Sequence, residues 1–159
     1  MLILFFKPYI IGDFIMAQGE KGTVEEINIF TTRLVTPERK EAIIPNGKIV
    51  DGNIINMTRE GKIRVDISVG ISYGADIDEA REVLLHVPRD HPLVLDDPVP
   101  SVLVNALGDS SVNLIVRSFC LPSDYRDVYF QVTEQCKKAL DAAKITIPFP
   151  QRVIHTVKE

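Results

Sequence analysis

The sequence predicts two small domains, one built from β-strands and one of α+β type, followed by a separate C-terminal strand. Three observations predict this fold class. Residues 11–58 contain short apolar runs broken by turn residues, without a helical period. Residues 63–71 alternate between apolar and mostly polar side chains, as a half-buried strand does. Residues 77–87 and 128–143 carry apolar side chains at helical spacing.

The first domain, residues 11–58, is expected to be a small β-barrel or sandwich without helices. Its apolar runs lie at 14–17, 23–36, 42–44 and 53–58 and are rich in β-branched residues. The segments 19–22 and 37–40 are typical of turns. Pro45 ends the third run, because proline has no amide hydrogen to donate to a neighbouring strand.

The second domain, residues 59–147, is expected to be an α+β sandwich. A helix begins after Asp76, which resembles an N-cap with Glu79 three residues later, and Pro88 and Pro92 are expected to end it. Two strands, 102–107 and 112–119, flank a hairpin signal, and a second helix begins at Asp124. The order strand, helix, strand, strand, helix resembles half or more of a ferredoxin-like fold.

Both ends of the chain leave an element without an obvious partner. Residues 1–6 are apolar but too few to cross a bilayer, which takes about 20 residues. They are either a first strand or the stub of a longer element. At the other end, residues 148–150 predict a stiff extended linker, and the tail 151–157 is β-prone. A lone strand is unstable, so the tail is expected to pair within the chain or with copies from other chains.

The sequence contains no pattern typical of a catalytic, cofactor or metal site. The three histidines share no ligand spacing, and Cys120 and Cys136 form no paired motif. We expect both cysteines to be reduced and buried. No nucleophile elbow or phosphate loop is present. The net charge of −4 and the lack of a Lys/Arg run give no support for a nucleic-acid surface. We therefore expect neither an enzyme nor a cofactor.

Several strings resemble the small-conductance mechanosensitive channel (MscS) family. Residues 43–49 and 52–60, IIPNGKI and GNIINMTRE, are similar to the family's IPN(G/S)KI and GNIxNxSRE. Residues 69–80, VGISYGADIDEA, resemble VGVxYDxDIDxA, with Gly74 where an aspartate is common. Residues 107–113 and 145–152, LGDSSVN and ITIPFPQR, resemble LGxSSIN and IxIPFPQ, and Gly22 begins a weaker match, GTVE. Their common order over almost the whole chain makes the resemblance specific.

One departure from the family pattern carries a structural expectation. The family often has glycine after the second helix, where Lys144 stands here. A residue other than glycine at that place predicts a small backbone strain or a different helix end.

The resemblance implies an assembly and a set of functional residues. The first domain would be Sm-like, and copies of the chain, a heptamer in the family, would form a hollow cage under a pore. The chain would lack the family's membrane helices, with residues 1–10 as the end of the pore-lining helix. The stub residues would be Leu2, Phe5, Phe6 and Lys7. The loop Pro45, Asn46, Gly47 and Lys48 would couple the cage to the pore, although Pro-Asn-Gly is also ordinary turn chemistry. The tail 148–159 would join a barrel between subunits through Pro148, Phe149, Pro150, Gln151 and Val153.

The function implied by the resemblance is passive. Membrane tension would open a pore that releases ions and small osmolytes on hypo-osmotic shock, at the cytoplasmic face of a bacterial inner membrane. The partners would be other copies of the chain, the membrane through further helices, and the permeating solutes, with no nucleic acid. The fragment alone would be soluble. The alternative is a stand-alone soluble module that binds a small molecule or regulates, as such small folds also do.

Overall fold

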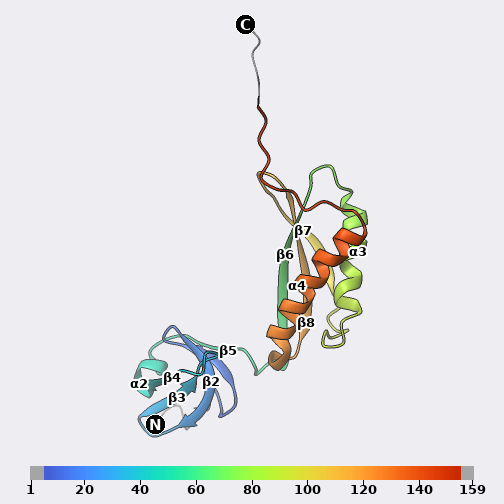
Figure 1. Ribbon diagram of the computed structural model, residues 1–159. Coiled ribbons are helices and arrows are strands. Elements are labelled where there is room, and N and C mark those ends of the chain that lie inside the picture. Colours follow the sequence, from blue (N-terminus) through green and yellow to red (C-terminus); the bar gives the residue numbers. More distant parts are fainter. Residues whose placement is uncertain (1–5, 155–159) are drawn as a thin grey trace. The chain divides into compact units, whose positions relative to one another are not determined.

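The computed structural model describes residues 6–154, which fold into two compact units divided between Ile63 and Arg64 (Figure 1). The first unit is an antiparallel sheet with one short helix. The second unit is a three-stranded sheet with two long helices. An α+β protein of mixed sheets and helices is the fold class that the sequence predicted.

The sheet of the first unit has the strand order β4-β3-β2-β1-β5, so β4 and β5 are its edges. Every neighbouring pair is antiparallel. The strands are β1 (Phe14–Ala17), β2 (Glu20–Ile27), β3 (Thr31–Val35), β4 (Glu41–Pro45) and β5 (Ile54–Asn56). The expected single run 23–36 is therefore two strands, because residues 28–30 turn the chain back on itself.

The first hairpin turns earlier than the glycines suggested. Gln18 and Gly19 both have positive φ, 53° and 83°, which is the geometry of a two-residue hairpin turn that follows the strand twist. Strand β2 consequently begins at Glu20, and Gly22 lies within it rather than in a turn. A Cβ atom at Gly22 would lie 2.7 Å from the carbonyl oxygen of Val35, so this glycine allows the close approach of two strands.

The expectation of no helix in the first unit is wrong, because a short helix α2 (Asn46–Val50) follows β4. Five residues are too few to display a helical period, so the sequence pattern could not reveal it. Tertiary packing stabilises it instead: Ile49 is fully buried in the core of the unit. The other buried members of that core are Tyr9, Ile15, Ala17, Val24, Leu34 and Ile44.

The second unit has strands β6 (Ile63–Ile71), β7 (Ser101–Leu107) and β8 (Val112–Cys120), with β8 in the middle. Helices α3 (Ile77–Arg89) and α4 (Tyr125–Ala142) pack against each other and cover the sheet (Figure 1). The predicted order of strands and helices is confirmed. Alternate residues of β6 and β8 face the core: Val65, Ile67, Val69, Ile71, Val112, Leu114, Val116, Ser118 and Cys120.

The two helix ends that the sequence singled out have defined geometry. The Asp76 carboxylate accepts hydrogen bonds from the amides of Asp78 and Glu79 at 2.8 and 3.0 Å, which confirms the N-cap. Helix α3 runs to Arg89, so Pro88 lies in its last turn and does not end it. Pro88 has no amide hydrogen, so the helix lacks one backbone hydrogen bond in its last turn, and it continues one residue further to Arg89.

Helix α4 ends with Lys144 in the left-handed region, at φ 59°. The amide of Ile145 donates to the Leu140 carbonyl at 2.9 Å, and the amide of Lys144 donates to the Asp141 carbonyl at 3.0 Å. These two bonds are those of a Schellman helix end, whose left-handed position is usually glycine. The strain expected at Lys144 is therefore present.

Candidate functional site

Cys120, Cys136 and His91 are buried in the second unit. Within residues 6–154, no group of three or more His, Cys, Asp or Glu side chains could hold a metal ion. Burial, with the charge of Asp124, raises the pKa of Cys120 to about 11, and burial raises the pKa of Cys136 to about 12. Thiols that ionise so poorly are weak nucleophiles. His91 is buried, with Nε2 3.0 Å from Gln131 Oε1, and its Nδ1 accepts a bond from the Leu93 amide.

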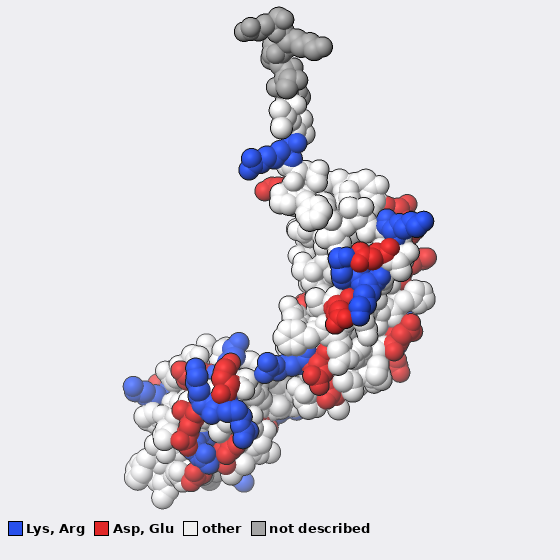
Figure 2. All heavy atoms as spheres, viewed as in Figure 1, with Lys and Arg blue, Asp and Glu red and all other residues white. Residues whose placement is uncertain are grey.

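The charged side chains form no surface of a single sign on the face that Figure 2 shows. Lys and Arg are interspersed there with Asp and Glu on each unit. Arg33 is an example, because its guanidinium makes ion pairs with Glu25, Glu26 and Glu41 at 3.2–3.4 Å. Such a mixed surface lacks the basic stripe that binds a phosphate backbone.

The loop Pro45–Lys48 divides into one buried residue and three exposed ones. Asn46 is 5% exposed, whereas Pro45, Gly47 and Lys48 face solvent at the start of α2. The Asn46 amide nitrogen donates to the carbonyls of Asn28 and Ile29 at 2.8 and 3.2 Å. Its side-chain oxygen accepts a bond from the Thr32 hydroxyl at 2.8 Å. The buried Asn46 side chain therefore holds the β2–β3 turn against α2.

The polar chain through Asn46 continues to the segment that enters the first unit. The Thr32 hydroxyl lies 2.8 Å from the phenol oxygen of Tyr9, and both groups are buried. The Thr32 hydroxyl donates its hydrogen to Asn46, so its oxygen accepts a hydrogen bond from the Tyr9 hydroxyl. Burial raises the pKa of the Tyr9 phenol. The side-chain polar atoms of Tyr9, Thr32 and Asn46 all have hydrogen-bond partners, as buried polar groups require.

Two exposed apolar residues beside this loop were not singled out by the sequence patterns. Ile29 and Phe30, in the β2–β3 turn, are 61% and 81% exposed. The backbone amide of Asn46 donates to the Phe30 carbonyl at 2.8 Å, so this turn is tied to the loop at several points. The signal in the sequence that could have revealed this pair is that two large apolar residues follow one another inside a turn. We call the exposed set Ile29, Phe30, Gly47 and Lys48 the loop surface.

The segment expected to be the end of a pore helix is described only in part. Leu2 and Phe5 lie outside the described residues. Phe6 is 70% exposed, and Lys7 is exposed with φ 45°. The Arg59 guanidinium donates to the carbonyl oxygens of Lys7 and Pro8 at 3.3 and 2.9 Å. The course of the chain after residue 6 is therefore fixed by a side chain from just beyond β5.

The C-terminal tail forms no strand within its described part, residues 148–154. Phe149, Val153 and Ile154 are 84%, 83% and 81% exposed, and Pro150 and Gln151 are exposed as well. Pro148 is half-buried. The tail has apolar side chains but no sheet neighbour in the described chain, which is the situation of a strand that needs a partner.

The start of the tail is nevertheless anchored to the second unit. The amide of Ser72 donates to the Thr146 carbonyl at 2.9 Å, and the amide of Gln151 donates to the Ser110 hydroxyl at 3.0 Å. The Tyr73 hydroxyl donates to the Gly108 carbonyl at 2.6 Å. Three of the strings that carried the family resemblance, around residues 72, 110 and 147, therefore meet at one end of this unit.

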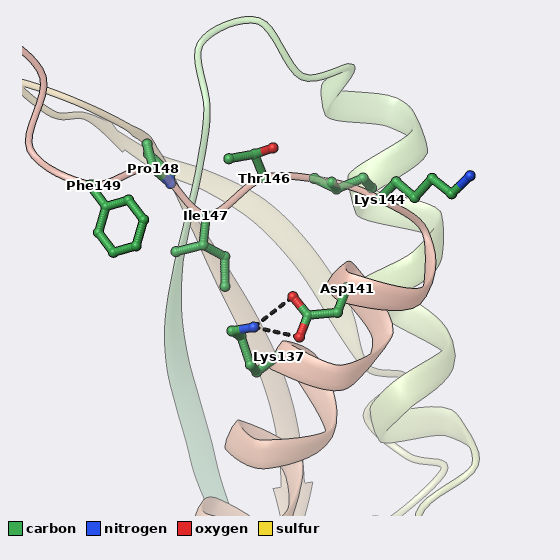
Figure 3. Close-up of a pocket in the computed structure, with 8 residues that line it drawn as sticks. Lys137, Asp141, Lys144, Thr146, Ile147, Pro148 and Phe149 are labelled. Carbon is green, nitrogen blue, oxygen red and sulfur yellow. Dashed lines mark hydrogen bonds and ion pairs between the residues drawn. The ribbon is translucent and has the colours of Figure 1, made fainter.

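A groove of about 540 Å³ lies between the last turns of α4 and residues 144–149 (Figure 3). The Lys137 amine pairs with the Asp141 carboxylate, at 2.6 Å from Oδ1. Figure 3 shows the Lys144 amine pointing away from this pair. The polar groups of the groove do not converge on a common point, which a specific small-molecule site requires.

None of the helices in the described part of the chain is both long and apolar enough to span a bilayer. Comparison with known protein families gives two matches, which follow one another along the chain. Residues 1–59 match "Mechanosensitive ion channel, beta-domain", and residues 65–147 match "Mechanosensitive ion channel MscS, C-terminal".

Individual relatives agree with the family matches. A small-conductance mechanosensitive channel of Edwardsiella ictaluri is 43% identical over 98% of this chain and 54% of its own length. An MscS family protein of Synechocystis is 37% identical over 99% of this chain and 53% of its own length. The chain thus spans about half the length of these relatives.

Solved structures give the same answer for the fold. The crystal structure of Helicobacter pylori MscS in its closed state superposes with a TM-score of 0.92 and 28% identity, over 99% of this chain and 63% of that chain. The cryo-EM structure of Arabidopsis thaliana MSL1 shares the fold alone, with a TM-score of 0.74 and 17% identity over 93% of this chain and 56% of that chain. The two domain matches, the relatives and the fold show together that the chain belongs to the MscS family of mechanosensitive ion channels, which are not enzymes.

Proposed function

We propose that this chain is the cytoplasmic part of a tension-gated channel, and that seven copies form a hollow cage beneath its pore. The observation that carries the proposal is the match to both family domains in order, with 43% identity to a small-conductance mechanosensitive channel. The full-length protein would release ions and small osmolytes on hypo-osmotic shock at the bacterial inner membrane. The cage would screen solutes by size and charge before they reach the pore.

The two open edges of the first sheet support a ring. Strand β4 lies at one edge and β5 at the other. Ile43 on β4 and Ile55 on β5 are 62% and 47% exposed, so both edges carry an apolar side chain. Pairing β4 of one copy with β5 of the next is a head-to-tail contact, and such contacts close into a ring when the rotation allows. A closed ring leaves no unpaired edge.

The exposed tail supports a second contact between copies. Pro148, Phe149 and Pro150 hold the chain extended, and Gln151 and Val153 follow in a β-prone segment. We infer that the tails of neighbouring copies pair with one another and form a small barrel. This arrangement would bury Phe149 and Val153, which the single chain leaves almost fully exposed.

The loop surface is proposed to contact the pore helix when the channel closes or adapts. In this arrangement Asn46 acts as a positioning residue, because its side chain is buried and holds the turn that presents Ile29 and Phe30. Gly47 and Lys48 would lie at the contact itself. The plain-turn alternative assigns these residues no role beyond reversing the chain.

The coupling role is tested in the full-length parent by patch-clamp recording under sustained stretch. Phe30→Ala removes an exposed side chain, so we expect altered adaptation with unchanged thermal stability. Val50→Ala, at another exposed position of the first unit, is the matched control. Unchanged adaptation in both Phe30→Ala and Asn46→Ala would contradict the coupling role and support the plain-turn alternative.

The assembly is tested first by native mass spectrometry of this chain, whose single copy weighs 17.8 kDa. A species of seven copies supports the cage. A monomer or dimer that is stabilised by one discrete small molecule supports the alternative of a stand-alone binding module. The groove beside α4 is the feature that favours this alternative, but the Lys137 amine there is already paired with Asp141. In cells, failure of the full-length parent to protect against hypo-osmotic shock would contradict the channel function.

A further inference from the structure

The chain enters and leaves the first unit at neighbouring points. Strand β1 begins where β5 ends, because Ile15 pairs with Asn56 in the antiparallel register. The amide of Met57 donates to the Phe14 carbonyl at 2.9 Å, just beyond the last pair. Residues 7–13 therefore lead into β1 beside residues 57–59, which lead out of β5. We call this place the mouth of the β1–β5 pair.

The mouth lies beside the shortest strand of the sheet. Strand β5 has three residues, lies at the edge, and pairs only with β1 in the described chain. Hydrogen bonds of an antiparallel ladder lie perpendicular to the strands. A force that separates the entering and leaving segments would therefore break these bonds one after another, and β5 would peel away from β1.

A polar cluster closes the mouth. The Asp13 carboxylate accepts hydrogen bonds from the Asn56 side-chain amide at 2.7 Å and from the Thr58 hydroxyl at 3.1 Å. The Phe14 amide donates to the Thr58 hydroxyl at 3.2 Å. Arg59 adds its bonds to the carbonyls of Lys7 and Pro8. Each of these bonds joins the entering segment or the first residue of β1 to the leaving segment or the last residue of β5, and none is a backbone bond of the ladder.

The charge state of the cluster favours these bonds. Burial acts to raise the pKa of Asp13, but its hydrogen bonds from Ile10, Asn56 and Thr58 and the charge of Arg59 lower the pKa overall. Asp13 is therefore an ionised acceptor at neutral pH. Hydrogen bonds to a charged acceptor are about twice as strong as those between neutral groups.

We propose that Asp13, Asn56, Thr58 and Arg59 form a mechanical clamp that prevents β5 from peeling away from β1 when the chain is pulled from both sides of this unit. The bonds of the clamp lie at the open end of the β1–β5 ladder, so a force that separates the entering and leaving segments loads them before the rest of the ladder. The purpose of the clamp, to keep this unit folded while a channel moves under tension, rests on the proposed function. The clamp itself does not, since it is a property of the chain alone.

The clamp is tested by single-molecule force spectroscopy on the whole chain, held at its two termini. Unfolding of residues 13–59 releases about 160 Å of extended chain and unfolding of residues 64–145 releases about 290 Å, so the two units give separate steps. We expect Asp13→Ala and Arg59→Gln each to raise the unfolding rate of the first unit at a given force at least tenfold. Forced unfolding reports this rate directly.

Arg33→Gln is the matched control. Arg33 is also a surface arginine of the first unit with several polar partners, but they lie on β2 and β4, away from the mouth. Its loss should change the unfolding rate less than twofold. Arg59→Gln replaces an exposed side chain and keeps the fold, so it serves alone if Asp13→Ala does not fold.

A second pulling direction separates a clamp from general stability. Lys21→Cys with Lys40→Cys places both attachment points in exposed positions away from the mouth. The native Cys120 and Cys136 are buried and do not compete for attachment. In this direction Arg59→Gln should unfold at the rate of the unmutated chain. An equal effect in both directions, an equal effect of Arg33→Gln, or no effect at the termini overturns the clamp. Failure of the proposed channel function would change none of these results.

Discussion

Replacing Lys144 with glycine is expected to stabilise the second unit, although it removes a side chain and adds no contact. Lys144 has φ 59° at the end of α4, where its own amide and that of Ile145 complete the helix end. The left-handed conformation brings Cβ close to the carbonyl oxygen and costs a residue other than glycine about 1–2 kcal/mol. Glycine does not have this cost.

The net gain is smaller than the strain, because glycine also gives the unfolded chain more freedom. That freedom lowers stability by about 0.4–1 kcal/mol, so Lys144→Gly should be more stable than Lys144→Ala by about 1 kcal/mol. The lysine charge near a helix C-terminus contributes about 0.3–1 kcal/mol, which both variants lose. We therefore expect the order glycine, lysine, alanine, with lysine about 0.3–1 kcal/mol more stable than alanine.

Differential scanning calorimetry of the whole chain measures this order. For a domain of this size, about 1 kcal/mol corresponds to a shift of about 4–8 °C in Tm between the glycine and alanine variants. The transition of the first unit should not move, since Lys144 belongs to the second unit. A glycine variant no more stable than the alanine variant would refute the assignment of strain to this residue.

Three further outcomes follow from buried or charged groups. The pKa of Asp13 is lowered in the folded chain, so its contribution to stability is complete above the unfolded pKa of about 3.9 and is lost as the pH falls through the folded pKa. Urea unfolding of the first unit from pH 6 to pH 2 should show this loss of stability. The stability of Asp13→Asn should lack the part of the pH dependence that comes from Asp13. Asn46→Asp replaces the donor to the Asn28 and Ile29 carbonyls with a buried carboxylate. It should destabilise the first unit by about 1–3 kcal/mol at pH 7 in the same urea assay, and an unchanged unfolding midpoint would contradict this. Cys120 and Cys136, with pKa values raised to about 11 and about 12, should resist alkylation at pH 8 until the chain unfolds, as mass spectrometry can count; rapid labelling of the folded chain would show that the thiols are accessible.

The elements that the sequence predicted well are those whose signal is local. The alternation at residues 63–71 sets which face of β6 is buried, because side chains on a strand point to opposite faces in turn. Asp76 caps α3 through amides only two and three residues away. The departure at Lys144 was legible for the same reason, since a helix end is decided by the residues within one turn of it.

The interactions that the sequence did not predict join residues far apart in the chain. Asn46 belongs to a Pro-Asn-Gly string that is typical of a turn, yet its side chain is buried against carbonyls 17 and 18 residues earlier. Arg59 was part of a family string, but its partners at Lys7 and Pro8 are 52 and 51 residues away. Helix α2 is likewise held by its buried Ile49 rather than by its own five residues. No local pattern contains such contacts.

The anchoring of residues 146 and 151 to the second unit bears on how easily a barrel of tails would assemble. A tail that was free from the end of α4 would search a large volume before it met its neighbours. The bonds from Ser72 to Thr146 and from Gln151 to Ser110 instead fix the course of the chain as far as residue 151. In the proposed ring this shortens each tether and raises the effective concentration of neighbouring tails. Part of the entropy cost of ordering the tails in the barrel is then met when each subunit folds, before any two subunits associate.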